Sequence, residues 1–353
     1  MGLFDEVLKD SESLFKEELA LDFEYQPKLL KFRENEQFQI ASSIKPLFQK
    51  RNGSNVFITG KPGIGKTVAT KHVLNEIEQE TNDILPIYVN CWQKDTSFKI
   101  ILSICDSIGY KFTQNKNTDE LWGDVSKILN KRSSVIVLDE IDKVQDYHIL
   151  YSLLEDLYRK SILLITNDKE FLSSLDKRIL SRLIPETIEF KPYNENETYE
   201  ILKNRAEVAL VKNVLTEESL KLISEKSFEM RDIRVGLFLV REAGNIAEQR
   251  LKKKIEKEEA EKAIEKLADF KIKNSASLTE EQDKILNLIK ENNGKSTTEI
   301  HKFLENDISY RTFFRKLKEL EEGNLISMKE ENIGPGKKTI VNFGSTKKLD
   351  EFR

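Results

Sequence analysis

A glycine-rich segment directly after a short apolar run places the strongest constraint on how this chain can fold. Residues 60–67 read GKPGIGKT and fit the pattern GxxxxGK[ST], and the apolar run at 55–59 precedes them. Glycines in this pattern let main-chain N–H groups surround a polyphosphate at the N-terminus of the next helix. With a strand before it and a helix expected over 67–80, the segment predicts a nucleotide site in an α/β fold rather than an ordinary glycine-rich turn.

The side chains of this loop predict separate contacts with the nucleotide. Lys66 can reach the β- and γ-phosphates, and the Thr67 hydroxyl can bind Mg²⁺. The nucleotide-binding residues expected from the loop are Gly60, Pro62, Gly63, Ile64, Gly65, Lys66, Thr67 and Val68.

An acidic pair follows a second apolar run. Residues 134–138, SVIVL, are typical of a buried parallel strand, and Asp139 and Glu140 come directly after them. Because ligands of open α/β sheets bind at the carboxyl ends of the strands, Asp139 is expected to hold Mg²⁺ through its waters. Glu140 is expected to orient and polarise the water that attacks the γ-phosphate. Without the glycine-rich loop, the pair would more simply belong to a solvated loop.

Polar residues also follow a third apolar run, at 161–166. Asn167 comes next and can bridge the attacking water and the γ-phosphate, although a lone asparagine there would more simply be a turn residue. Arg178 and Arg182 lie in a segment expected to form a helix and a loop. A planar guanidinium suits the charge of a phosphoryl transition state, so either can act as an arginine finger, including toward a neighbouring subunit, or be an ordinary surface charge.

These features resemble the AAA+ ATPases and, within them, the archaeal origin-recognition initiators, which are relatives of the eukaryotic Orc subunits and the cell-division-control loader. The similarity covers residues 10–345 and is carried by YQP at 25–27, FRE at 32–34, NVFI at 55–58, YVNC at 88–91, VLDEID at 137–142, TND at 166–168, FKPY at 190–193 and ILKNRA at 201–206. The resemblance implies an α/β AAA+ P-loop ATPase with a parallel five-stranded sheet between helices, an all-α lid, and ATP or ADP with Mg²⁺ as cofactors.

The resemblance also implies roles for individual residues. Lys66 and Thr67 match the Walker A ligands, Asp139 and Glu140 match the Walker B pair, and Asn167 matches the first sensor.

The resemblance implies further roles for residues beside the adenine base and in the helical lid. Arg234 matches the second-sensor arginine that reaches from the lid to the nucleotide, with Arg231 in place of the usual glycine. In the family, Tyr193 and the segment 25–33 flank the adenine, and here they can equally be packing elements. Arg182 is the preferred arginine finger, because Ser181-Arg182 matches the arginine-finger motif of the wider AAA+ class. Many archaeal initiators lack an arginine at this position.

Composition excludes several classes of protein. The chain has 353 residues, 33% of them charged and 39% hydrophobic, and no stretch approaches the roughly 18 apolar residues that span a bilayer. The N-terminus lacks the basic start of a signal peptide. Cys91 and Cys105 can make neither a disulfide framework nor a zinc site and are expected in the core. A cytoplasmic protein without membrane contact is therefore expected.

The C-terminal residues predict a DNA-binding domain. The net charge of −4 restricts any DNA contact to a local surface. Three helices within 279–321 and two strands, at 325–329 and 339–343, around the basic segment 334–338 describe a winged helix. Its third helix enters the major groove and its wing contacts the backbone or minor groove, unless the domain binds protein instead. The expected DNA-binding residues are Arg311, Arg315, Lys316, Lys337 and Lys338.

The expected domains are a nucleotide-binding core at 1–192, a helical lid at 193–272 and the winged helix at 279–345. An insertion at 91–121 matches an initiator-specific element that touches DNA in relatives, and its role here stays open. Together these features predict an ATP-dependent replication initiator that binds double-stranded origin DNA and helps to recruit or load the MCM helicase, with slow ATP hydrolysis as a switch. Self-association or assembly with initiator paralogues is also implied.

Two other functions fit the same sequence. One is an ATP-regulated winged-helix regulator of transcription or replication without loader activity. The other is a clamp-loader-like or transposition ATPase whose winged helix binds protein.

Overall fold

The computed structural model describes residues 13–273, 280–304, 308–322, 326–333 and 336–343. The chain divides into two compact units, with the boundary between Ala263 and Ile264. This boundary falls inside helix α12 (Lys257–Lys273), ahead of the expected end of the lid at residue 272. Within the described ranges, no helix combines the length and the apolar character needed to cross a membrane.

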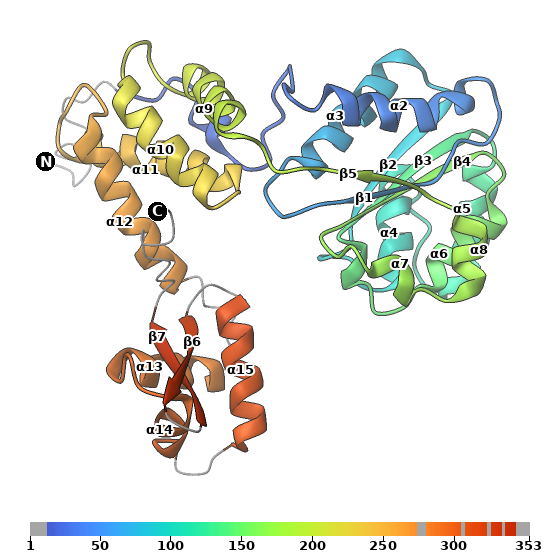
Figure 1. Ribbon diagram of the computed structural model, residues 1–353. Helices are drawn as coiled ribbons and strands as arrows, with labels where there is room; N and C mark the ends of the chain where they lie inside the picture. Colours follow the sequence, from blue (N-terminus) through green and yellow to red (C-terminus); the bar gives the residue numbers. More distant parts are fainter. Residues whose placement is uncertain (1–12, 274–279, 305–307, 323–325, 334–335, 344–353) are drawn as a thin grey trace, which may run out of the picture. The chain divides into compact units, whose positions relative to one another are not determined.

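A parallel five-stranded sheet forms the centre of the first unit (Figure 1). Its strands are β1 (Val56–Thr59), β2 (Ile84–Asn90), β3 (Ser133–Asp139), β4 (Lys160–Thr166) and β5 (Glu186–Glu189), in the order β2-β3-β4-β1-β5. The expected five-stranded parallel sheet is confirmed, and β3 and β4 begin and end within one residue of the apolar runs that predict them.

Helices cover both faces of the sheet. One face carries α2 (Glu34–Phe48) and α3 (Lys66–Glu80), and the other carries α4 (Ser97–Ser107), α5 (Thr118–Leu129), α6 (His148–Asp156), α7 (Phe171–Ser174) and α8 (Lys177–Leu183) (Figure 1). In β3, Ile136 and Leu138 enter one hydrophobic core, and Val135 and Val137 enter the other. Because both faces are buried, the strands are apolar throughout rather than alternating. Both cysteines are buried, as expected.

A helical region follows the sheet within the same unit. It contains α9 (Glu195–Ala209), α10 (Glu217–Glu229), α11 (Ile233–Gln249) and the start of α12. The side chains of Asn194, Thr216 and Asp232 accept backbone N–H groups at the starts of the first three helices. The short helix η1 (Glu18–Leu21) packs against this region, so residues near the N-terminus lie beside helices that begin some 170 residues later.

In its described residues beyond α12, the second unit has three helices and an antiparallel hairpin. They are α13 (Glu280–Glu291), α14 (Thr297–Lys302), α15 (Tyr310–Glu322), β6 (Ile326–Ile333) and β7 (Gly336–Phe343). The apolar side of α15 contributes Phe313, Leu317 and Leu320 to a core shared with the other two helices and both strands.

Two expectations for the second unit need correction. The strands are longer than predicted, because pairing continues to Ile333 opposite Gly336. Lys337 and Lys338 therefore lie in β7 rather than in a loop, while residues 334–335 fall outside the described part. Lys316 is only 8% exposed, so it does not share the outer face on which Arg311 and Arg315 are exposed.

Candidate nucleotide site

The glycine-rich loop connects β1 to α3 at the carboxyl edge of the sheet, as predicted. Gly63 and Gly65 have φ of 71° and 90°, in the left-handed region that favours glycine. A Cβ on Gly63 would lie 1.9 Å from the Asp232 carboxylate, and one on Gly65 would lie 2.6 Å from the Tyr193 hydroxyl. These two glycines are therefore required by the close approach of other elements as well as by the turn of the backbone.

Lys66 points back across the loop. Its ammonium donates hydrogen bonds to the carbonyls of Gly60 and Lys61, at 2.7 and 2.8 Å, and to Asn167 Oδ1 at 2.7 Å. Burial lowers the pKa of Lys66 to about 8, and the nearby Asp139 carboxylate opposes this shift. The structure thus brings Lys66 and Asn167 together, although 101 residues separate them in the sequence.

Asp139 receives donors from three elements. Thr67 Oγ1 donates to Asp139 Oδ2 at 2.6 Å, the Tyr88 hydroxyl donates to the same oxygen at 2.8 Å, and the N–H of Glu140 donates to Oδ1 at 2.9 Å. The side chain of Asp139 is buried, so these donors replace water in fixing its orientation. Thr67 and Asp139, which are both expected to bind Mg²⁺, thus meet across the site, and Tyr88 is an additional partner of Asp139.

Glu140 begins the turn after β3. Its φ of 56° is in the left-handed region, which is uncommon for a residue with a side chain and is enriched at functional sites. Burial raises the pKa of its carboxyl, and Asp139 and Asp142 raise it further. Asp142 itself accepts a hydrogen bond from Thr166 at 2.6 Å, which ties this turn to the end of β4.

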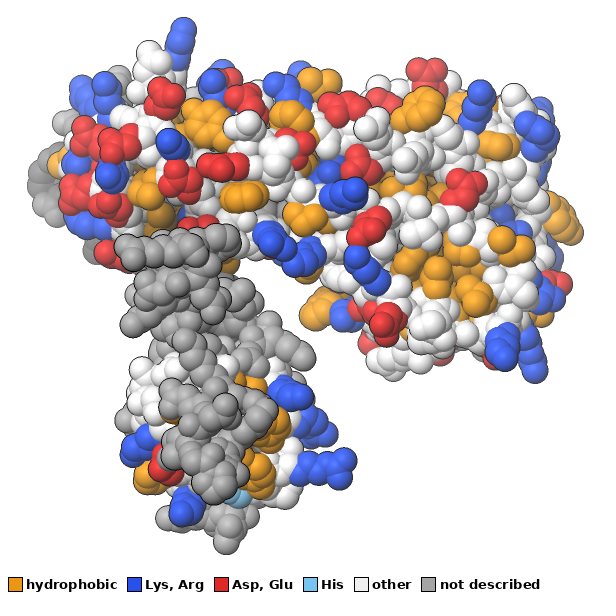
Figure 2. All heavy atoms as spheres, viewed as in Figure 1, with side chains coloured by type: hydrophobic (Ala, Val, Ile, Leu, Met, Phe, Trp, Pro, Cys, Tyr) orange, Lys and Arg blue, Asp and Glu red, His pale blue; other side chains and the backbone are white. Residues whose placement is uncertain are grey.

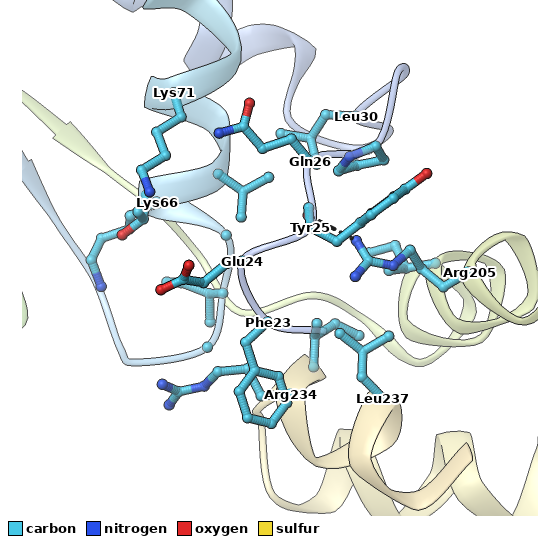
Figure 3. Close-up of a pocket in the computed structure, with 18 of the residues that line it drawn as sticks. Phe23, Glu24, Tyr25, Gln26, Leu30, Lys66, Lys71, Arg205, Arg234 and Leu237 are labelled. Carbon is cyan, nitrogen blue, oxygen red and sulfur yellow. Dashed lines mark hydrogen bonds between the residues drawn. The ribbon is translucent and has the colours of Figure 1, made fainter. Parts of the chain in front are cut away.

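A cavity of about 860 Å³ opens beside the loop (Figure 3). One wall contains the loop, Asp139, Glu140 and Asn167; the other comes from residues 23–31 and from the helical region. Figure 3 shows Phe23, Glu24 and Tyr25 between Lys66 and the helical side chains Arg205 and Leu237. The apolar and aromatic side chains within this wall, among them Phe23, Tyr25 and Leu237, are suited to contact a nucleotide base.

Arg33 joins the glycine-rich loop to the segment that contains Lys191 and Tyr193. It is 4% exposed, and its guanidinium donates to the Ile64 carbonyl at 3.1 and 3.0 Å and to the Lys191 carbonyl at 2.6 Å. The guanidinium also lies 3.9 Å from the centre of the Tyr193 ring. Tyr193, an expected nucleotide contact, does line the cavity. Sequence reasoning did not single out Arg33, although the FRE segment that contains it carried part of the resemblance.

Arg205 joins the helical region to the N-terminal segment. Its guanidinium donates to the carbonyls of Ala20, Asp22 and Tyr25, at 2.6, 2.7 and 3.3 Å, and lies 4.7 Å from the centre of the Tyr25 ring. Burial lowers the pKa of Arg205. Sequence reasoning missed this role too, because nothing in the sequence indicates which carbonyls a distant arginine will meet.

Arg234 lies at the start of α11 and lines the cavity. Its guanidinium pairs with Asp232 at 2.6 Å, and this hydrogen bond raises the pKa of Arg234. The adjacent N–H of Ile233 donates to the Gly63 carbonyl at 3.2 Å, so the helical region touches the phosphate loop directly. Arg231 has φ of 53°, which explains why a glycine suits its position.

The two candidate finger arginines lie away from the cavity. Arg182, on α8, donates to Glu155 at 2.7 Å and lies 5.2 Å from the centre of the Tyr151 ring. Arg178 is exposed on the same helix. Neither lines the cavity of its own chain, so a catalytic role for either would need a second copy.

The oxygens of Thr67 and Asp139 fit Mg²⁺ that binds together with phosphates. In nucleotide sites Mg²⁺ takes one or two protein oxygens and fills its shell with phosphates and water. Within the described residues, no group of three or more His, Cys, Asp and Glu side chains is arranged to hold a metal ion by itself. The site therefore suits a metal that is carried by the nucleotide.

The fold and this site define an AAA+ ATPase. Residues 49–175 match the model of the AAA domain, and residues 199–265 match the Cdc6 AAA+ ATPase-type lid domain. The expected AAA+ core and lid are thus confirmed.

Comparison with known proteins narrows the class to a family. The chain is 32% identical over 317 residues to the ORC1-type DNA replication protein 1 of Archaeoglobus fulgidus, covering 84% of this chain and 77% of that protein. It is 34% identical over 285 residues to the ORC1-type DNA replication protein of Pyrococcus furiosus, covering 75% and 68%. The chain therefore belongs to the family of ORC1-type DNA replication proteins.

Solved structures show the same fold. The ORC1 protein of Aeropyrum pernix in complex with DNA has a TM-score of 0.80 at 24% identity, over 95% of each chain. The ORC2 protein of the same organism, in ADPNP-ADP complexes, has a TM-score of 0.66 at 21% identity, over 96% of each chain.

Proposed function

We propose that this protein is an ATP-dependent DNA replication initiator that binds double-stranded origin DNA and helps to recruit or load the MCM helicase, with slow ATP hydrolysis as a switch. One observation carries the proposal: Lys66, Thr67, Asp139 and Asn167 meet at one edge of the sheet in a chain of the ORC1-type family. Two hydrogen bonds, Lys66 to Asn167 and Thr67 to Asp139, join the three motifs that nucleotide hydrolysis needs.

The chain's own residues divide the work on ATP. Lys66 neutralises the β- and γ-phosphates, for which it exchanges its bonds to the loop carbonyls. Thr67 and Asp139 would hold Mg²⁺, which would supply positive charge to the phosphates. Glu140 orients the attacking water and takes up its proton, a task that its raised pKa favours. Asn167 fixes the water against the γ-phosphate.

Arg234 provides a link between nucleotide and helical region. Its guanidinium pairs with the Asp232 carboxylate in this structure, and the γ-phosphate of a bound ATP would be a competing anion in the same cavity. Transfer of Arg234 from Asp232 to phosphate would make the position of α11 depend on whether ATP or ADP is bound. Such dependence is what a nucleotide switch requires.

The second unit provides the DNA-binding surface in this proposal. Three helices followed by an antiparallel hairpin support a winged helix, in which α15 enters the major groove. The exposed side chains of Arg311 and Arg315 on α15 support base or phosphate contacts. Lys337 and Lys338 on β7 belong to the wing. Arg182, or Arg178, completes the site of a neighbouring copy or paralogue.

Footprinting over the organism's replication origin tests this function. We expect discrete protected sites at the origin, none on a random duplex of equal length, and a pattern that changes between ATP and ADP. The variant Arg311→Ala/Arg315→Ala should lose the protection, whereas Lys302→Ala, an exposed residue of α14, should keep it. Protection of promoters but not of the origin would contradict the initiator function.

A further inference from the structure

Four cations gather at the amino edge of the sheet, opposite the nucleotide site. Lys50, Lys131, Arg132 and Arg159 line a small cavity of about 110 Å³ between the loops that lead into β1, β3 and β4. We call these four residues the amino-edge patch. This cavity is far smaller than the cavity of about 860 Å³ at the nucleotide site, so its size suits a phosphate group rather than a nucleotide. Figure 2 shows Lys and Arg side chains at the end of this unit that is farther from helices α9–α11.

Hydrogen bonds between the loops hold the patch together. Asn130 accepts the N–H of Tyr158 at 2.9 Å and donates to the Asp156 carbonyl at 2.8 Å. Arg159 donates to the Asn130 carbonyl at 3.3 Å, and the N–H of Ser133 donates to the Asp83 carbonyl at 3.1 Å. In the loop that carries Lys50, Asn52 Oδ1 accepts the N–H of Lys160 at 3.1 Å. The four cations are therefore carried on loops that are bonded to one another, which reduces the entropy lost when they bind an anion.

Among the described residues that line the cavity, cations outnumber acidic side chains. In the part of the chain that the structure describes, none of its four cations forms an ion pair, and Asp83 is the single acidic residue among those lining the cavity. By contrast, Arg250 and Lys252 both pair with the buried Glu259. On a protein with a net charge of −4, an unpaired cluster of this kind is a local site for an external anion.

We propose that the amino-edge patch binds the phosphodiester backbone of duplex DNA. It would be a second DNA contact, on the unit that carries the nucleotide site and separate from α15 and the hairpin. The concave shape and the clustered Lys and Arg side chains suit a phosphate group of the backbone. Because the patch contacts phosphates, which every duplex presents, its binding does not depend on the DNA sequence. This inference rests on the proposed function for its choice of DNA as the anion.

The salt dependence of DNA binding by the full chain tests the patch. The variant Lys50→Gln/Lys131→Gln/Arg132→Gln removes three exposed cations but leaves Arg159, which bonds the Asn130 carbonyl. The control Lys212→Gln/Lys221→Gln/Lys253→Gln removes three exposed charges of the helical region. Each phosphate contact contributes about 0.9 to the slope of log K against log salt, so the patch variant should lower the slope by about 2–3 on origin and random duplexes alike. The control should keep the wild-type slope.

The possible outcomes separate this inference from the proposed function. If the wild-type protein binds no duplex DNA, the proposed function is wrong, and the inference that rests on it is wrong as well. If it binds and the patch variant matches the control, the patch is not a DNA contact and the inference alone is overturned. If the patch variant binds poly-glutamate more weakly than the wild-type protein but keeps the wild-type salt slope on DNA, the patch binds an acidic protein. That result would also overturn the inference. The single variant Lys131→Gln supplies a second measurement, with an expected loss of about 0.9 in slope.

Discussion

Asp139 depends on its donors for the geometry that nucleotide chemistry needs. Burial and the neighbouring Asp139 carboxylate raise the pKa of Tyr88 well above its ordinary value, so the phenol stays protonated and remains a donor. Tyr88 and Thr67 both donate to Oδ2, and the N–H of Glu140 donates to Oδ1. A carboxylate held on both oxygens keeps one orientation toward the phosphate loop, and its charge contributes to the raised pKa of Glu140.

Lys66 gives a prediction about both affinity and pH. Lys66→Ala should abolish or severely weaken ATP binding while the fold is kept, and Lys61→Ala, an exposed neighbour in the same loop, should bind normally. Since the pKa of Lys66 is about 8, the free protein already carries this charge below pH 8. Above pH 8 the amine must take up a proton to meet the phosphates, so affinity should fall about tenfold per pH unit. Titration with a fluorescent ATP analogue measures both effects, and unchanged affinity in Lys66→Ala would remove the phosphate-loop assignment.

Substitution of Glu140 should separate ATP binding from ATP hydrolysis. Glu140→Gln keeps the size and hydrogen bonding of the side chain but removes the charge that polarises water. ATP should still bind, and turnover should fall by about 10²–10⁴-fold, the usual scale for a lost general base. Glu24→Gln removes another carboxylate from the cavity wall and should retain turnover. Single-turnover hydrolysis at the wild-type rate in Glu140→Gln would show that another group orients the water.

At the scale of elements, α9 and the N-terminal segment act as one wall of the cavity. Arg205 on α9 donates to three carbonyls within residues 20–25, and the backbone N–H groups of Lys16 and Glu17 donate to the Ala209 carbonyl at the end of the same helix. Residues 23–31, which line the cavity, follow this anchored stretch. The shape of the cavity therefore depends on contacts made outside it.

Arg205→Ala tests this dependence. The change leaves three carbonyls without their charged donor, so we expect the free energy of unfolding to fall by about 2–4 kcal/mol. ATP affinity should also fall, because residues 23–31 lose their anchor. Arg205→Lys should recover part of both losses, and Lys203→Ala, exposed on the same helix, should change stability by less than about 0.5 kcal/mol. Denaturant unfolding and ATP titration supply the measurements; an Arg205→Ala protein with wild-type ATP affinity would show that the wall does not need this anchor.

At the scale of the whole molecule, a negative net charge is combined with separate basic surfaces. The chain carries 57 Lys and Arg against 61 Asp and Glu, which makes general attraction to DNA weak. Arg311 and Arg315 lie on the second unit, and the amino-edge patch lies on the first. If both proposed surfaces contact DNA, affinity should depend on contacts at both units, and ATP should affect only the first unit directly.

The second unit should read sequence through α15 and bind the backbone through the hairpin. Arg311→Ala or Arg315→Ala should cost about 1–3 kcal/mol, mainly on origin DNA, if the side chain contacts a base edge. Lys337→Ala/Lys338→Ala should weaken binding to all duplexes and lower the salt slope by about two. Salt titrations on origin and random duplexes distinguish these effects. Wild-type binding by every variant would make this unit a protein-docking module.

The sequence alone determined the features that are local. The loop at 60–67, the apolar runs that become β3 and β4, and the polar residues at their ends could be predicted, because strand burial and the glycine pattern are properties of short segments. Only the tertiary structure decided which distant groups meet. Arg33 and Arg205 bond carbonyls at least 31 residues away, Lys316 is buried, and the amino-edge patch is assembled from three separate loops. A charged side chain looks the same in the sequence whether it faces water, a carbonyl or an anion, and only packing distinguishes these cases.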